Sequence, residues 1–218
     1  MIYPLDINIS NDLIQSALAE MPTVDFRLTL NQPTGTFFYD PWTIKDEFKN
    51  SPWEQLLDSL PFNLGEARIV ILSPKQTYSS HSDIDNRWHL ALTNQNSFLI
   101  DLSAKKMHDC EIGTWYSMDA GVQHTAANFG LTDRVHLLVR QLLTNSELKH
   151  PVKYKIEANK SKLVPHRYIF DEVYSPLLNR LNVNNKLANF TKNNDSFCFE
   201  TEKDIQIPNN ENFIITCK

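Results

Sequence analysis

From Glu66 to Leu143 the chain is a succession of short apolar or alternating segments separated by turn residues. None of the intervening stretches is long enough for the helix that normally connects parallel strands. The strands that this pattern predicts cover residues 67–72, 87–93, 97–102, 113–118, 123–128 and 134–143. Short strands at such even spacing favour an antiparallel sandwich or barrel, so we expect a mainly β fold.

The sequence before this region predicts two helices that pack against the β core. The first covers residues 9–21, where apolar residues recur at helical spacing. The second covers residues 52–60, because Ser51 precedes Pro52, and proline is favoured at the first position of a helix.

The sequence after this region predicts a C-terminal α/β extension. A polar, proline-containing stretch divides the chain into a first domain, residues 1–145 with its β core at about 66–143, and an extension, residues 146–218. The extension has an apolar stripe that predicts a helix at about 167–182, restarted at Ser175-Pro176. We expect an Asn/Lys-rich mobile loop at 182–195 and two late strands at 196–201 and 213–217.

Composition excludes several classes of protein. The 218 residues carry a formal net charge of −5, and no cluster of Lys and Arg is large enough for a nucleic-acid-binding face. No apolar run approaches the ~20 residues of a membrane span. The first residues lack the basic and apolar regions of a signal peptide, and the three cysteines have no metal-binding spacing. We therefore expect a cytoplasmic protein with no nucleic-acid or membrane partner, and the oligomeric state stays open.

A set of scattered polar residues indicates a metal site. His81 and Asp83 are two apart, so on a strand they would point to the same face. Such a pair is weak evidence alone, because one is expected by chance in a chain with seven histidines. His124 and Arg134 flank a turn near Gly130, so in a hairpin they would fall roughly opposite each other, ~5 Å apart at Cβ.

Two histidines and one carboxylate form the facial triad of non-haem Fe(II) oxygenases. Zinc with the same ligands and a water molecule is the competing chemistry. Arg134 favours iron, because a ferrous oxygenase with a dicarboxylate co-substrate needs a fixed guanidinium beside its metal, which a hydrolytic zinc site does not generally need. Arg87 and His89 share a second strand face and would point into the cavity if Trp88 and Leu90 pack against the N-terminal helices.

These residues resemble the aspartyl/asparaginyl β-hydroxylase-like branch of the 2-oxoglutarate- and Fe(II)-dependent oxygenases. The first matching blocks are Ile71-Leu72-Ser73-Pro74, His81-Ser82-Asp83 and Arg87-Trp88-His89-Leu90-Ala91-Leu92. The later blocks are Gly113-Thr114-Trp115-Tyr116, Gln123-His124-Thr125-Ala126-Ala127-Asn128 and Arg134-Val135-His136-Leu137. The similarity covers about residues 67–142, and it departs from the family at Lys75, where glycine is frequent.

The resemblance implies a double-stranded β-helix, the jelly-roll or cupin-like fold. It implies that Fe(II) binds to His81, Asp83 and His124, with no catalytic residue beyond these ligands. Arg134 would hold the distal carboxylate of 2-oxoglutarate, and Arg87 and His89 would serve its other end. The implied reaction consumes 2-oxoglutarate and O2, releases succinate and CO2, and hydroxylates a substrate C–H bond.

Several alternatives stay open. The protein could be a metal-binding cupin that acts as a hydrolase or isomerase, or a non-catalytic barrel that binds a carboxylate. His136 and Arg140 share strand parity with Arg134, and Arg140 is the alternative anchor if the register slips. Asp85 is a second-choice carboxylate, more typical of a turn beside Asn86. A free amino acid, an Asp/Asn-type side chain of a peptide and other small polar molecules are all compatible substrates.

Overall fold

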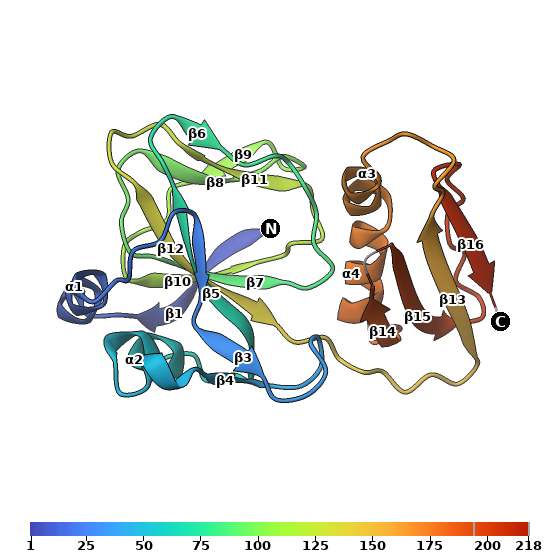
Figure 1. Ribbon diagram of the computed structural model, residues 1–218, viewed down its shortest axis with the longest axis horizontal. Coiled ribbons are helices and arrows are strands. Elements are labelled where there is room, and N and C mark those ends of the chain that lie inside the picture. The colour runs from blue at the N-terminus through green and yellow to red at the C-terminus, as the bar shows by residue number, and fades with distance from the viewer. Residues whose placement is uncertain (194, 218) are drawn as a thin grey trace.

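The computed structural model describes residues 1–193 and 195–217. Figure 1 shows a β core on one side and an α/β region with its own sheet on the other. The first and larger sheet of the core is antiparallel, with strand order β1-β10-β7-β12-β5-β2. Its strands are β1 (Ile2–Asn8), β2 (Arg27–Thr29), β5 (Leu64–Leu72), β7 (Arg87–Ala91), β10 (Thr114–Met118) and β12 (Arg134–Gln141).

The second sheet of the core has the order β6-β11-β8-β9. Its strands are β6 (Gln76–Thr77), β8 (Ser97–Asp101), β9 (Lys106–His108) and β11 (His124–Asn128). From β5 to β12 the chain passes repeatedly between the two sheets, so the large sheet holds the order β10-β7-β12-β5 and the small one β6-β11-β8-β9. This is the strand order of a double-stranded β-helix, and the fold-class prediction is confirmed.

The N-terminal helices pack outside the large sheet, as expected. They are α1 (Asn11–Ala19), which begins after a Ser10 cap, and α2 (Pro52–Asp58), which begins after a Ser51 cap. A short hairpin, β3 (Asn31–Pro33) and β4 (Trp42–Ile44), and the 3-10 turn η1 (Asp46–Phe48) complete this layer. Apolar residues of both helices and the outer face of the large sheet form one cluster, including Ile14, Trp53, Leu56, Ile69, Leu90, Trp115 and Leu137.

Strand alternation then decides what faces inward. On β7, Trp88 and Leu90 belong to the outer apolar cluster, whereas Arg87 and His89 line the cavity between the sheets. On β5, Ile69 faces the helices and Arg68 lines the cavity. The helices therefore cover the apolar face, and the charged face is enclosed by the second sheet.

The C-terminal region contains a four-stranded antiparallel sheet in the order β14-β15-β13-β16, with two helices packed on it. Its elements are β13 (Pro151–Ala158), α3 (His166–Val173), α4 (Ser175–Val183), β14 (Ala188–Lys192), β15 (Ser196–Glu202) and β16 (Phe213–Cys217). The helices lie between this sheet and the β core (Figure 1). The predicted restart at Ser175 and both late strands are confirmed.

One prediction in this region is wrong. The stretch 182–195, expected to be a mobile loop, contains β14, whose Ala188 and Phe190 are buried. Their alternation with polar neighbours outweighs the Asn/Lys-rich composition that suggested a loop. Residue 194, also within that prediction, lies outside the described residues, as does residue 218 of the predicted extension.

The division at residue 145 stays a prediction. Ile84 and Leu143 of the first part are buried in the C-terminal apolar cluster with Phe170, Tyr174 and Leu178. The two parts therefore share a core rather than meeting only at a surface. None of the helices in the described ranges is long and apolar enough to cross a membrane.

Candidate metal and carboxylate site

A cavity of about 430 Å³ opens between the two sheets. Its walls come from β5, β7 and β12 of the large sheet, from β8 and β11 of the small sheet, and from the segment around Tyr78–Asp83. A further wall comes from α3 of the C-terminal region. All six residues that the sequence predicted for the site line this one cavity: His81, Asp83, Arg87, His89, His124 and Arg134.

The two histidines of the predicted triad face each other across an isolated antiparallel bridge. The His81 amide donates to the His124 carbonyl at 3.0 Å, and the His124 amide donates to the His81 carbonyl at 2.9 Å. Directly opposed residues share a face, and the two imidazole centroids are 4.5 Å apart.

Each imidazole is oriented by a backbone carbonyl. His81 Nδ1 lies 2.9 Å from the Ser79 carbonyl oxygen, and His124 Nδ1 lies 2.8 Å from that of Val122. A carbonyl oxygen can only accept, so Nδ1 carries the proton and donates in both rings. The two Nε2 atoms are then left with free lone pairs, as a metal ligand requires.

Asp83 completes the set. Its Oδ2 lies 3.7 Å from His81 Nε2 and 3.6 Å from His124 Nε2, and one ligand atom from each residue lies within 4.8 Å of the others. Ligands ~2.0–2.2 Å from a metal are roughly 3 Å apart, so small side-chain adjustments would close the site. Burial alone would raise the pKa of Asp83. Arg87 and the two histidines nevertheless hold this pKa well below its usual range. The donor set fits a divalent metal.

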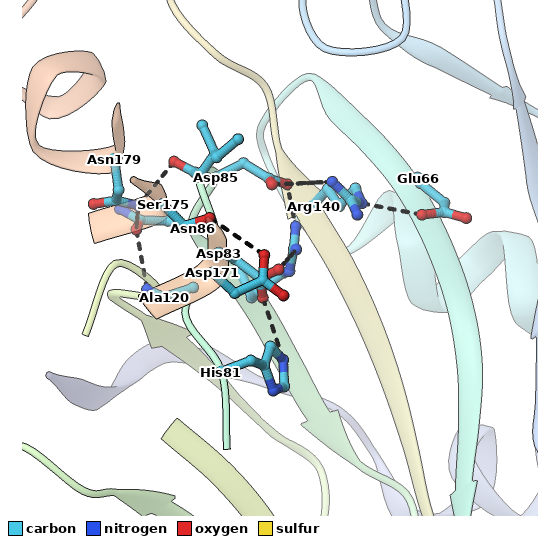
Figure 2. A network of polar contacts seen from close by, with 12 residues as sticks. Glu66, His81, Asp83, Asp85, Asn86, Ala120, Arg140, Asp171, Ser175 and Asn179 are labelled. Atoms are coloured by element: carbon cyan, nitrogen blue, oxygen red, sulfur yellow. Dashed lines mark hydrogen bonds and ion pairs between the residues drawn. The ribbon is translucent and has the colours of Figure 1, made fainter. Parts of the chain in front are cut away.

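Figure 2 shows Asp83 between His81 and a charged network that extends to Glu66. Arg87 Nη2 is 2.8 Å from Asp83 Oδ1, as an ion pair rather than an aligned hydrogen bond, and Arg87 Nη1 bonds to Asp85. Arg140 Nη1 contacts the same Asp85 at 3.0 Å, and Arg140 Nε contacts Glu66 at 3.0 Å. Arg87 thus faces two carboxylates of the protein, and its predicted contact with a co-substrate stays a prediction.

Farther along the cavity, Arg134 forms a second polar cluster with His136 and His89. Arg134 is 3% exposed, and its Nη2 lies 3.0 Å from His136 Nδ1. Its Nε, and both ring nitrogens of His89, have no hydrogen-bond partner among the described residues. Burial lowers the pKa of Arg134 to about 10 and, together with the Arg134 charge, lowers the pKa values of His89 and His136 well below 6.5.

Buried donors without acceptors are costly unless a ligand supplies the acceptor. A carboxylate is the group that a guanidinium fork binds best. The residues around Arg134 therefore fit a carboxylate ligand next to the metal site.

The predicted hairpin between His124 and Arg134 is wrong. His124 begins β11 of the small sheet, whereas Arg134 begins β12 and pairs with Leu72 of the large sheet. The segment 129–133 therefore crosses from one sheet to the other. Turn residues mark where a strand ends and carry no information on which sheet receives the next strand. The two side chains still share the cavity because both face its interior.

The other residues that the sequence offered as candidates lie partly inside and partly outside the cavity lining. His136 lines the cavity, whereas Arg140 is engaged by Glu66 and Asp85 outside its lining. Asp85, interpreted from sequence as a turn residue, is 3% exposed and bridges two arginines. Lys75, which departs from the family pattern, adopts a φ of 60°.

Sequence reasoning missed the α3 wall, formed by Arg167, Tyr168 and Asp171. Burial, followed by the nearby charge of Asp83, raises the pKa of Asp171 to about 6, partly offset by Arg167 and Lys192. The spacing of the three residues on one helical face was visible in the sequence, but the contact of that face with the cavity was not.

Comparison with known proteins gives one family match. Residues 51–142 match the family described as aspartyl/asparaginyl beta-hydroxylase. A search of curated proteins found no match.

Two solved structures show distant similarity. One is a cupin domain from Bordetella pertussis Tohama I, with 15% identity and a TM-score of 0.33 over 37% of this chain and 84% of that one. The other is a viral collagen prolyl hydroxylase from Paramecium bursaria Chlorella virus-1 in a complex with 2-oxoglutarate, with 10% identity and a TM-score of 0.43 over 64% of this chain and 93% of that one. The strand order described above defines the fold without them.

Proposed function

We infer, from the match of residues 51–142 to the aspartyl/asparaginyl β-hydroxylase family, that this chain is an Fe(II)- and 2-oxoglutarate-dependent dioxygenase. One observation carries the proposal. His81 and His124 direct Nε2 at Asp83 in the same cavity that contains the buried Arg134. No carboxylate of the described residues forms an ion pair with Arg134.

In the proposed enzyme, His81, Asp83 and His124 hold Fe(II), which would supply the activation of O2. The Ser79 and Val122 carbonyls keep the imidazoles oriented, and Arg87 keeps the carboxylate ionised and in place. These restraints hold the ligands ready before the metal arrives, so little rearrangement opposes binding.

Arg134 binds the distal carboxylate of 2-oxoglutarate in this proposal. His89, with two unpartnered ring nitrogens, is positioned to donate to the other end, together with Arg87. The reaction converts 2-oxoglutarate, O2 and a substrate C–H into succinate, CO2 and C–OH. One oxygen atom enters succinate and the other enters the hydroxyl group. The buried walls keep bulk water from the reacting atoms.

The substrate is an amino acid, an Asp/Asn-type side chain of a peptide or a similar small polar molecule. Cytoplasmic location and the lack of nucleic-acid and membrane partners stay predictions. A zinc hydrolase or isomerase would not need the Arg134 cluster. A non-catalytic carboxylate-binding barrel would not need the triad.

Succinate formation from 2-oxoglutarate tests the proposal. The full chain, supplied with Fe(II) and ascorbate, should form succinate, and His124→Ala should abolish it. The matched control is His108→Ala, a histidine outside the cavity lining, which should keep wild-type turnover. Hydrolysis or isomerisation without 2-oxoglutarate, or succinate formation that survives His124→Ala, would contradict the proposal.

Arg134→Gln separates co-substrate binding from metal binding. Loss of a buried charged hydrogen bond should raise the half-saturating 2-oxoglutarate concentration roughly 10–100-fold. Mn(II) affinity should change little, because Arg134 bonds to His136 and forms no hydrogen bond or ion pair with the triad among the described residues. Unchanged 2-oxoglutarate affinity would show that the anchor is elsewhere.

A further inference from the structure

The cavity has a wall that the family match does not cover. Residues 51–142 match the family, yet α3, at His166–Val173, lines the cavity through Arg167, Tyr168 and Asp171. These residues lie on one face of the helix, because positions three and four apart are neighbours on a helix surface. The same face carries one cation and one anion.

Asp171 is a carboxylate whose charge is only partly compensated by Arg167 and Lys192. Its side chain is 20% exposed, and its nearest cation, Arg167, approaches only to 3.8 Å. Its hydrogen bond from Ser175 is long, at 3.5 Å. The negative charge of Asp83 acts on Asp171 and raises its pKa further. A cation brought into the cavity would relieve the uncompensated part of this charge.

The contact between Arg167 and Asp171 is suited to exchange. The Arg167 side chain is 86% exposed, and ion pairs with so exposed a partner are weak because water screens them. A ligand that presents its own cation to Asp171 and its own carboxylate to Arg167 would replace one weak pair with two. Asp83, the other carboxylate that lines the cavity, is less available to the cation of such a ligand, because Arg87 already pairs with it.

We propose that α3 is the substrate-binding wall of this enzyme, and that it binds a small zwitterion, with Asp171 on the cationic nitrogen and Arg167 on the carboxylate. The inference rests on the proposed function and narrows its substrate to a free amino acid or a close analogue. The cavity size agrees, since about 430 Å³ lies toward the small end of the ~300–1,000 Å³ of ligand pockets and also holds the co-substrate.

Direct binding tests the proposal without turnover. Calorimetry would titrate the proteinogenic amino acids, each with its N-acetyl and amide derivative, into the full chain loaded with Mn(II) and 2-oxoglutarate at about pH 8. At least one free amino acid should bind, and blocking its amine or its carboxylate should weaken binding roughly 10–100-fold, as expected for loss of a charge-assisted bond.

Three variants identify the residues. Asp171→Asn keeps the side-chain shape and should weaken binding of that amino acid roughly 10–100-fold, but should bind its N-acetyl derivative as wild type does. Arg167→Gln should show the same pattern toward the amide. Glu172→Gln is the matched control, because Glu172 neighbours Asp171 but is exposed and outside this cavity. It should bind as wild type does.

Failure of this proposal is distinguishable from failure of the proposed function. Succinate formation without any amino-acid binding would overturn the zwitterion wall and leave the oxygenase intact. Equal binding of free and N-acetyl forms, or wild-type affinity in Asp171→Asn, would overturn the assigned role of Asp171. Amino-acid binding that depends on Asp171 in a protein that makes no succinate would support the wall and contradict the oxygenase.

Discussion

Lys75 occupies a backbone position suited to glycine. The turn Ser73-Pro74-Lys75-Gln76 closes with a hydrogen bond from the Gln76 amide to the Ser73 carbonyl at 3.3 Å. Proline at the second position and a φ of 60° at the third are typical of a type II turn. Glycine is frequent at this point in the family that the chain resembles, and this chain keeps the turn with a side chain in the left-handed region.

Lys75→Gly should therefore stabilise the protein. The left-handed conformation destabilises a residue with a side chain by ~1–2 kcal/mol. Glycine removes this strain, but its greater freedom in the unfolded chain offsets part of the gain in stability. We expect a net gain of about 0.5–1 kcal/mol in the free energy of unfolding, measured with urea. Lys106→Gly, in strand β9, is the control and should lose a similar amount. A loss at Lys75 would mean that its side chain contributes more than the turn costs.

The buried histidines make stability depend on pH. Burial holds the pKa values of His89 and His136 well below 6.5, so both stay neutral in the folded state. In the unfolded chain each binds a proton below about pH 6.5. The unfolded state then holds more protons, so stability is complete above this pH and falls as pH decreases below it.

Each such histidine contributes a slope of up to ~1.4 kcal/mol per pH unit. His136→Gln should reduce the slope of unfolding free energy between about pH 6.5 and 5 by about this amount, measured by urea denaturation at each pH. His150→Gln, at an exposed position, should keep the wild-type slope. An unchanged slope in His136→Gln would show that His136 is protonated in the folded protein.

At the scale of elements, helix α4 holds the loop that carries Asp83. Asn179 of α4, 4% exposed, donates through Nδ2 to the Ile84 carbonyl and to Asn86 Oδ1, both at 2.9 Å. Asn86 Oδ1 also accepts from the Ala120 amide at 3.2 Å, and the Asp83 amide donates to the Ala120 carbonyl at 2.7 Å. Figure 2 shows the hydrogen bonds that link Asn179, Asn86 and Ala120.

Asn179→Ala should therefore weaken metal binding without touching a ligand. We expect Mn(II) affinity, measured by calorimetry, to fall roughly tenfold, the lower end of the effect of groups that orient metal ligands. Stability should fall by about 1–3 kcal/mol, because the buried Ile84 carbonyl loses the Asn179 donor, whereas Asn86 Oδ1 keeps the Ala120 amide. Asn184→Ala is the control, since that side chain bonds only within its own helix end. Wild-type Mn(II) affinity in Asn179→Ala would show that the loop holds its shape unaided.

The sequence predicted many of the longer elements, but not the strands β1 and β13, which have seven and eight residues. The alternating strands β7 and β12 and the capped helix α2 were found within a few residues. Strands β6 and β9, of two and three residues, were missed because no period fits in so short a segment. The three candidate metal ligands were identified from residue type and spacing, but their juxtaposition comes from a bridge between two segments, which spacing alone does not specify.

At the scale of the whole molecule, the C-terminal region is part of the site. Periodicity predicted a helix near residues 167–182 and its apolar face. It could not predict that this helix contacts the cavity, because that contact depends on how the two folded parts pack together. Ile84, next to the metal ligand Asp83, and Leu143 supply the joint by packing into the C-terminal apolar cluster. We therefore expect the two regions to unfold together.

The four tryptophans make this cooperativity measurable. All lie in the N-terminal part of the chain: Trp42, Trp53, Trp88 and Trp115. Their fluorescence therefore reports unfolding of the β core and its N-terminal layer, whereas far-ultraviolet circular dichroism reports both regions. In the wild type, the two signals should give coincident urea transitions.

Leu178→Ala, in the C-terminal region, tests whether the two regions unfold together. Leu178 is fully buried in the C-terminal cluster, so its truncation should cost about 2–5 kcal/mol. If the regions unfold as one unit, the tryptophan transition shifts by that full amount, although no tryptophan lies in the C-terminal region. Val183→Ala, 58% exposed on the same helix, should shift it by less than about 0.5 kcal/mol. An early dichroism transition with the tryptophan transition unmoved would show that the region unfolds independently, and metal affinity would then survive its unfolding.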